Sequence, residues 1–279
     1  MCTKLKKGSF VTRSTANQLI RHYRSGKWKE TNDFVTVEEP LEIVVACGKK
    51  RKTVAITMRT PGHDDELAVG FLYTEGFLSI DEDVEDSQKE ENRIELRVSE
   101  SVFDKVSTSE QLDRYSFVNA SCGLCGRTSI ESLRERGFRR IQSDLTLPIK
   151  RLQGLPDAMK MAQKVFQHTG GLHAAGIFDK NGKAMIVRED IGRHNAVDKA
   201  IGLAFDDEIL PLNDQVLMVS GRMSYEIVQK ALSAQIPILA AVSAPSNLAI
   251  KTAHEFGMTV VGFLRGDSLN VYTHPERIH

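Results

Sequence analysis

Apolar and polar positions alternate along the first part of the chain in a way that predicts a small β-rich module. Residues 41–46 and 53–58 are rich in strand-forming side chains, and Gly48-Lys49-Lys50 between them is typical of a hairpin turn. Acidic residues at 64–66 begin a predicted helix, because negative charge is favourable at the positive end of a helix dipole. Apolar and charged residues then alternate at 94–98, which predicts a half-buried strand.

These elements divide the first half of the chain into two predicted segments. Residues 33–110 are predicted to form a small α+β module. Residues 1–32 are polar and basic, with Trp28 as the one large apolar anchor, and are predicted to form a mobile arm.

Strands and helices alternate over residues 151–279, which are predicted to form a separate α/β domain. Strands at 172–178 and 184–187 flank Asp179-Lys180-Asn181-Gly182, a strong hairpin signal. Short apolar strands separated by helices favour a mostly parallel sheet covered on both faces, in a mixed order with helical crossovers. Further strands are predicted at 216–219, 236–242 and 258–263, and helices at 155–167, 194–203, 225–234 and 247–256.

Composition and charge exclude several classes of protein. Lysine plus arginine equals aspartate plus glutamate at 37 each, so no charge excess points to nucleic acid or a membrane surface. The apolar stretches are too short to span a bilayer, and the first residues lack the apolar core of a secretion signal. Four cysteines are too few for a disulfide framework in a chain of 279 residues. We therefore expect a cytoplasmic protein with reduced thiols, and neither nucleic acid nor membrane as a partner.

The most distinctive motif is the pair Cys122 and Cys125, set between glycines in Ser-Cys-Gly-Leu-Cys-Gly at 121–126. The polar sequence before this motif predicts an exposed loop within a connecting segment at 111–150. The alternative is that the cysteines lie at the start of a helix that begins near Ser129. Such a pair can be half of a metal site, a redox pair or a carrier thiol.

The rest of the sequence favours the carrier among these three chemistries. A zinc site needs a second pair of ligands at similar spacing, and a zinc deaminase needs His-x-Glu ahead of the cysteines; neither pattern is present. No metal site is therefore predicted. A thioredoxin-like motif directly follows a strand near the start of the chain, unlike this one. A thiolate favoured by nearby Arg127 can accept sulfur from a persulfide.

Three loops in the second half are candidates for binding an anion. They lie at 190–194, 220–224 and 243–247, where strands give way to predicted helices whose free N–H groups suit phosphate. Ordinary helix capping explains Ser243 and Ser246 without a ligand, and Ser220 begins the second of these loops. Arg193 and Arg222 add bidentate donors, and His194 in a first helical turn is a candidate neutral acceptor.

Six motifs in order resemble those of the FdhD family, the formate dehydrogenase accessory sulfurtransferases. The resemblance runs from about residue 40 to residue 277. Besides the motif at 121–126 it comprises Thr-Gly-Gly-Leu-His-Ala-Ala at 169–175, Glu-Asp-Ile-Gly-Arg-His-Asn-Ala-Val-Asp-Lys at 189–199, Ser-Gly-Arg-Met-Ser-Tyr-Glu at 220–226, Ala-Val-Ser-Ala-Pro at 241–245 and Val-Tyr-Thr-His-Pro at 271–275.

This resemblance implies a fold, a function and a set of site residues. The implied fold is a cytidine-deaminase-like α/β domain with a mixed sheet and helices on both faces, beside a smaller N-terminal α+β module, in a homodimer. The implied function is transfer of persulfide sulfur from a cysteine desulfurase, through Cys122 with the assistance of Cys125, to the molybdenum bis-molybdopterin guanine dinucleotide cofactor of apo formate dehydrogenase. A guanine nucleotide would mimic that cofactor. The implied cofactor-binding stretch is Phe263, Leu264, Arg265, Gly266, Asp267 and Ser268, where Ser268 replaces a residue that is often basic in the family.

Two rival functions remain open at this point. A cofactor chaperone would deliver the dinucleotide without carrying sulfur covalently. A zinc-bridged dimer would take two thiolates from each of two chains, which gives about half a zinc ion per chain.

Overall fold

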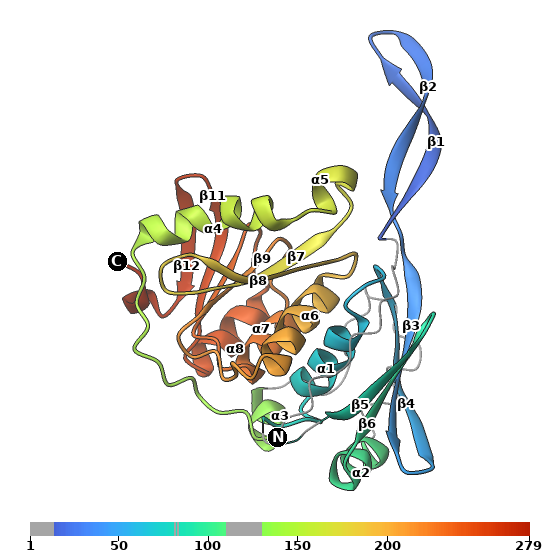
Figure 1. The fold of residues 1–279 in the computed structure, drawn as a ribbon. Coiled ribbons are helices and arrows are strands. Elements are labelled where there is room, and N and C mark those ends of the chain that lie inside the picture. The colour runs from blue at the N-terminus through green and yellow to red at the C-terminus, as the bar shows by residue number, and fades with distance from the viewer. Residues whose placement is uncertain (1–13, 81, 83, 110–129) are drawn as a thin grey trace.

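The computed structural model describes residues 14–80, 82, 84–109 and 130–279. Its strands form three sheets, with two, four and six strands (Figure 1). The two-stranded sheet is a hairpin of β1 (Thr15–Arg24) and β2 (Lys27–Thr36), which projects away from the rest of the molecule (Figure 1).

The four-stranded sheet belongs to the predicted α+β module. Its order is β4-β3-β6-β5, and strands β3 and β4 are the hairpin predicted around Gly48. Helix α1 (Asp64–Thr74) begins with the three acidic residues that predicted it. The strands are β3 (Glu39–Cys47), β4 (Lys50–Arg59), β5 (Val84–Glu90) and β6 (Arg93–Val98), and helix α2 spans Glu100–Thr108.

The six-stranded sheet is mixed, as predicted, in the order β12-β11-β10-β9-β7-β8. Only the β9–β10 and β10–β11 pairs are parallel, whereas the β12–β11, β9–β7 and β7–β8 pairs are antiparallel. The prediction of a mostly parallel sheet was therefore wrong. The strands are β7 (His173–Phe178), β8 (Ala184–Asp190), β9 (Val216–Val219), β10 (Ile238–Ala241), β11 (Thr259–Arg265) and β12 (Ser268–Thr273).

Helices cover both faces of this sheet (Figure 1). Helix α4 packs on one face, over a core that contains Phe178 and Met218, while the larger core on the other face contains Ile177 and Leu217. Successive strand residues therefore enter opposite cores, which is why the strands are apolar throughout. The helices are α3 (Ile130–Glu135), α4 (Ile149–Ala162), α5 (Phe166–Thr169), α6 (Arg193–Asp206), α7 (Tyr225–Ser233) and α8 (Asn247–Glu255), followed by a 3₁₀ turn at Pro275–Arg277.

Helices α1 and α6 join the module to the six-stranded sheet in one continuous core. They cross through two glycines: a Cβ on Gly70 would stand 1.9 Å from the carbonyl oxygen of Asp198, and one on Gly202 would stand 1.8 Å from that of Glu66. Any larger residue at either position would push the two helix backbones apart.

Two segments have more regular structure than the sequence predicted. Residues 15–32 of the predicted mobile arm lie in the β1–β2 hairpin, because β-branched and aromatic residues pair across a turn at Ser25-Gly26, where both residues have positive φ. The polar run after Ser99 contains α2, which buries Val102, Phe103 and Val106 on one face and is capped by Ser99. The mixed α/β fold is thus confirmed, while the likeness to cytidine deaminase stays a prediction.

Candidate anion site at the sheet edge

The three predicted anion-binding loops meet at one end of the strands of the six-stranded sheet, where β9, β10 and β11 finish. This end is called the sheet edge below. Because β9, β10 and β11 are parallel, the loops that follow Val219 and Ala241 and the turn after Arg265 leave the sheet at the same edge. Strand β8 is antiparallel to β7 and ends at that edge with Asp190, where the loop at 190–194 begins. Strand β7 runs antiparallel to β9, so its first residue, His173, starts at that edge as well. This is where ligands collect in open α/β sheets.

His173, Ser220 and Arg193 surround the backbone of Gly221. The Ser220 hydroxyl accepts a hydrogen bond from the Ala174 backbone N–H at 2.9 Å and lies 3.4 Å from Nδ1 of His173. A Cβ on Gly221 would stand 3.4 Å from both the Arg193 Cδ and the His173 Nδ1, so the loop passes close beneath both side chains. Burial, and then the nearby Arg193 charge, lower the pKa of His173, against an opposing effect of Asp190.

His194 lies in the first turn of α6, as predicted, and its Nε2 is 3.2 Å from the Ser224 hydroxyl. Burial lowers its pKa to about 4, and the charges of Lys230 and Arg193 act in the same direction. The imidazole is therefore neutral at neutral pH and can accept a hydrogen bond, in agreement with the prediction. The main cause is desolvation, whereas the sequence suggested the helix dipole.

Arg193 supplies a donor that lacks a partner. Its Nε is buried and makes no hydrogen bond to any described residue. A buried guanidinium nitrogen without an acceptor is costly, and an anionic ligand at this edge would satisfy it. Arg222 is exposed in the next loop and makes no ion pair within the described part of the chain.

The stretch at 263–268 forms the end of β11, a turn and the start of β12. Phe263 has a left-handed backbone (φ 51°), donates its N–H to the Ser243 carbonyl at 3.2 Å and exposes 40% of its surface. Arg265 donates from Nε to the Val242 carbonyl at 2.8 Å, which ties the turn to the loop after β10. Ser243 is therefore brought to the same edge, as predicted.

Not every residue of that stretch reaches the edge with its side chain. Leu264 is fully buried in the core under α4, so it can contribute only its backbone. The Asp267 carbonyl accepts a hydrogen bond from Gln153 of α4, while Gly266 has positive φ and makes the turn. Ser268 is exposed as the first residue of β12.

A buried ion pair shapes the loop that carries Arg193, and sequence reasoning missed it. Lys199 Nζ lies 2.6 Å from Asp190 Oδ2 and donates to the Thr60 carbonyl at 2.9 Å. Asp190 Oδ1 in turn accepts from the N–H of Gly192 at 2.8 Å. A lysine in the second turn of a helix is usually exposed, so nothing in the sequence pattern predicted this buried ion pair.

A second buried network lies behind His194. Lys230 of α7 contacts two carboxylates, with Nζ 2.9 Å from Asp198 and 3.1 Å from Glu75, and donates to the Thr74 hydroxyl at 2.9 Å. The two carboxylates raise the pKa of Lys230 despite its burial. Burial raises the pKa of Asp198 to about 6, against the opposing effect of the Lys230 charge.

Cys122 and Cys125 lie outside the described residues, but the chain that follows them is anchored beside this network. Arg136, just after α3, donates to the Glu75 carbonyl at 2.8 Å, and Tyr225 of α7 shares a hydrogen bond with Ser132 of α3. Segment 130–136 therefore packs against the first turn of α7, one residue from Ser224.

No group of three or more metal-ligating side chains occurs among the described residues, a search that does not reach the two cysteines. In the same residues, no helix is long and apolar enough to cross a membrane.

Comparison with known proteins places this chain among sulfur carrier relatives. The model of the FdhD/NarQ family matches residues 36–279. A Saccharolobus solfataricus protein named sulfur carrier protein FdhD is 43% identical over 262 residues, covering 94% of this chain and 96% of the relative. A Mycobacterium tuberculosis protein of the same name is 43% identical over 281 residues, with 95% and 99% covered. A crystal structure from Desulfotalea psychrophila, described as a formate dehydrogenase accessory protein, shares the fold with a TM-score of 0.73 and 22% identity, covering 96% of this chain and 100% of that chain. The chain therefore belongs to the FdhD/NarQ family.

Proposed function

We propose that this protein is a sulfur carrier that acts in the maturation of formate dehydrogenase in the cytoplasm. The observation that carries the proposal is the family membership, with 43% identity over 94% of the chain to a relative named as a sulfur carrier. The Cys-x-x-Cys motif at 121–126 supplies the sulfur chemistry that such a role needs.

The proposed transfer uses Cys122 as the carrier. Its thiolate attacks the outer sulfur of a persulfide held on a cysteine desulfurase, which forms a new S–S bond on Cys122 and releases the desulfurase cysteine as a thiolate. Cys125 is the candidate for releasing that sulfur, because its thiolate can attack the Cys122 sulfur and form a disulfide as hydrosulfide leaves. In this role the protein is a sulfurtransferase.

The sheet edge supports the proposal that the acceptor is a phosphorylated dinucleotide, the molybdenum bis-molybdopterin guanine dinucleotide cofactor bound as substrate. Arg193, Arg222 and Arg265 bring three cations to this edge, and the buried Arg193 Nε has no hydrogen-bond partner among the described residues. Neutral His194, with Ser220 and Ser243, adds groups that accept or donate hydrogen bonds without repelling an anion.

The experiment is activation of apo formate dehydrogenase in a mixture of desulfurase, cysteine and this protein. We expect Cys122→Ala to abolish activation while binding of guanosine diphosphate, the probe for the cofactor site, is unchanged. Cys47→Ala is the matched control, because Cys47 is a half-buried thiol at the end of β3 and should leave activation intact.

The alternative functions give different results in the same experiment. A cofactor chaperone that never carries sulfur would activate the enzyme fully with Cys122→Ala, and this result would overturn the proposal. A zinc-bridged dimer would contain about half a zinc ion per chain on metal analysis, and Cys122→Ala would remove the metal.

A further inference from the structure

A pocket lies at the ends of α1 and α7, away from the sheet edge. Helix α7 begins at the sheet edge, directly after Ser224, and its last turn, with Leu232, forms one wall of the pocket. Tyr73 near the end of α1 forms a second wall, and residues 136–139 after α3 form a third. The pocket has a volume of about 320 Å³, near the lower limit for ligand pockets, so it suits one large side chain better than a dinucleotide.

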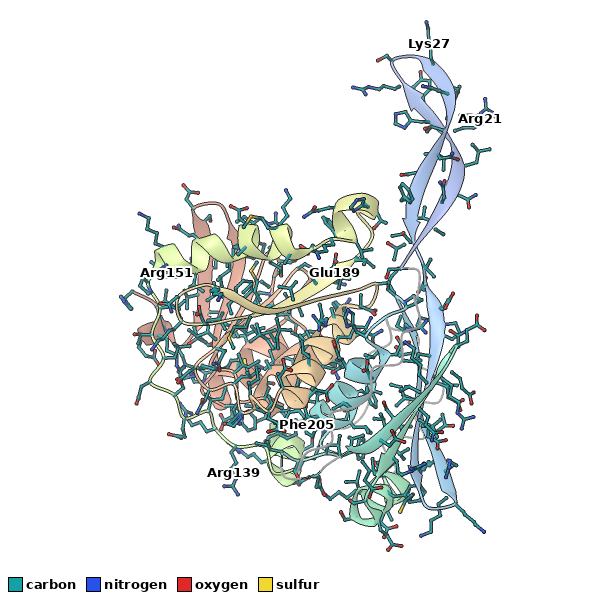
Figure 2. All side chains as sticks on the ribbon, viewed as in Figure 1. Arg21, Lys27, Arg139, Arg151, Glu189 and Phe205 are labelled. Atoms are coloured by element: carbon teal, nitrogen blue, oxygen red, sulfur yellow. The ribbon has the colours of Figure 1, made fainter. Side chains whose placement is uncertain are left out.

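The floor of this pocket is apolar and held in place by the core. Tyr73 donates its hydroxyl hydrogen to the Ser233 carbonyl at 3.0 Å, and its ring lies against that of Phe205 at a centroid distance of 5.7 Å. Phe205 and Arg139 are both labelled at this end of the molecule in Figure 2. Burial raises the pKa of Tyr73 to about 12, so the phenol stays neutral. The pocket is therefore formed before anything binds to it.

Apolar side chains at the rim of the pocket remain exposed. Ile80 leaves 50% of its surface in solvent, and Phe138 is half-buried. The Arg136 guanidinium lies over the Phe138 ring, 5.2 Å from its centroid, and donates to the Glu75 carbonyl at 2.8 Å. These contacts hold Phe138 at the rim. Exposed apolar side chains around a formed cavity are typical of a surface that binds another protein.

The charged side chains that line this pocket are positive. Among the described residues its lining contains Arg136 and Arg139 and no aspartate or glutamate. Arg136 is shared with Glu75, whose Oε2 lies 3.8 Å from the arginine Nη2. Arg139 is exposed and makes no hydrogen bond or ion pair with a described residue. An exposed cation beside an apolar cavity complements a carboxylate beside an apolar side chain.

We propose that this pocket docks the protein that donates sulfur, by taking a large apolar side chain next to an aspartate or glutamate of that partner. The inference rests on the proposed function. Residues 136–139 belong to the segment that follows the Cys-x-x-Cys motif in the chain, so a donor bound here is held beside the segment that leads to the carrier thiol. The acceptor is proposed to bind at the sheet edge, at the other end of α7, and a donor in this pocket leaves that edge free.

Two substitutions at the rim test the pocket in persulfide transfer from a cysteine desulfurase to the full-length protein. Ile80→Glu places a negative charge among the apolar groups, and Arg139→Glu reverses the charge that attracts the partner. Both side chains are exposed, so both variants should fold. We expect each change to raise the concentration of this protein at half-maximal rate about tenfold, as for loss of an interface anchor, without changing the maximal rate. Arg139→Lys keeps the charge and should behave as the parent does.

Matched controls lie on the opposite face of the six-stranded sheet. Ile149→Glu and Arg151→Glu repeat the two changes at exposed positions of α4 and should leave transfer unchanged. Inorganic polysulfide delivers sulfur to a thiolate without a docking surface, so it should load Cys122 equally in the parent and in every variant. A pocket variant that takes sulfur normally from polysulfide has lost docking and has kept its thiol.

The outcomes separate this inference from the function on which it rests. Transfer to the parent with unchanged half-maximal concentrations for Ile80→Glu and Arg139→Glu would overturn the docking site and leave the proposed function standing. Equal losses in the pocket variants and the α4 controls would also overturn it, because they would show a general effect of added negative charge. A desulfurase that fails to load the parent, although polysulfide loads Cys122, would contradict the proposed donor and the docking site together.

Discussion

At the candidate edge, burial and neighbouring cations determine the charge of each histidine. Burial is the largest cause of the low pKa of His194 and of His173, and Arg193 lowers the pKa of both. The lowered pKa of both rings limits the positive charge that they add at neutral pH, beside an Arg193 Nε that has no partner among the described residues.

His194 should make stability depend on pH. Its pKa is about 4 in the folded protein and 6.5 in the unfolded chain, so the unfolded state binds more protons between these values. The contribution of neutral His194 to the free energy of unfolding is complete above pH 6.5. It falls, by up to ~3 kcal/mol, as pH decreases toward 4. We expect His194→Gln to remove this loss, so that the free energy of unfolding in urea declines less steeply for the variant than for the parent.

The pH dependence of the free energy of unfolding must be compared between His194→Gln and the parent, because Asp198 affects this quantity in the opposite direction. Its raised pKa, about 6, favours the folded state at low pH, and that contribution is lost as pH rises through 6. Both proteins share this contribution, so the difference between their curves isolates His194. Identical slopes for the two proteins would show that His194 is not held neutral by burial.

Arg222 should contribute directly to nucleotide affinity. It is exposed at the edge without an ion-pair partner among the described residues, so its removal should cost one charge-assisted contact and little stability. We expect Arg222→Ala to weaken binding of guanosine diphosphate about tenfold, measured by calorimetry. Arg139→Ala, another exposed arginine but after α3, should bind normally; equal affinities for Arg222→Ala and the parent would move the phosphate site elsewhere.

At the scale of elements, the crossing of α1 and α6 determines how the module sits on the six-stranded sheet. The two helices approach through Gly70 and Gly202, which allows the backbone of each to pass where a Cβ would otherwise stand. The Lys230 and Lys199 networks lie next to this crossing and connect α1, α6 and α7. Close packing here is therefore a condition for the geometry of the candidate edge.

Gly202→Ala should destabilise the protein strongly, because the new Cβ would stand 1.8 Å from a backbone oxygen of α1. Overpacking of this kind costs at least about 1–3 kcal/mol, measured as the free energy of unfolding in urea. Gly154→Ala in α4 is the matched control: a Cβ there meets nothing within 4 Å, and alanine favours a helix interior by about 0.5–1 kcal/mol. Destabilisation of equal size at both positions would contradict the packing argument.

Strongly patterned elements were predictable, and weakly patterned ones were not. The β3–β4 hairpin, helix α1 and the β7–β8 hairpin follow from local alternation, turn chemistry and acidic residues at a helix start. Helix α2 and strand β5 were missed, because their polar residues face water and only a few apolar side chains mark the buried side. The β1–β2 hairpin was missed for a related reason: its large apolar side chains stay exposed in the part of the chain that the structure describes, so few buried positions mark its strands.

At the scale of the whole molecule, sheet topology gathers residues that are far apart in sequence. Strands β9 and β10 end just before Ser220 and Ser243, and at the same edge β7 begins with His173 and β8 ends just before Arg193. The loops were predictable from strand-to-helix transitions, and the structure brings them together as expected. The supporting ion pairs, such as that of Lys199 with Asp190, could not be predicted from the sequence, because burial of a charged side chain becomes evident only when its partner is located in the structure.

Mass spectrometry of the protein after incubation with a cysteine desulfurase and cysteine shows whether Cys122 accepts sulfur. We expect a gain of about 32 Da, one sulfur atom, on the peptide containing residues 121–126, which a reductant removes and Cys122→Ala abolishes. An unmodified Cys122 under conditions in which the desulfurase itself is fully persulfurated would contradict the proposed sulfur transfer.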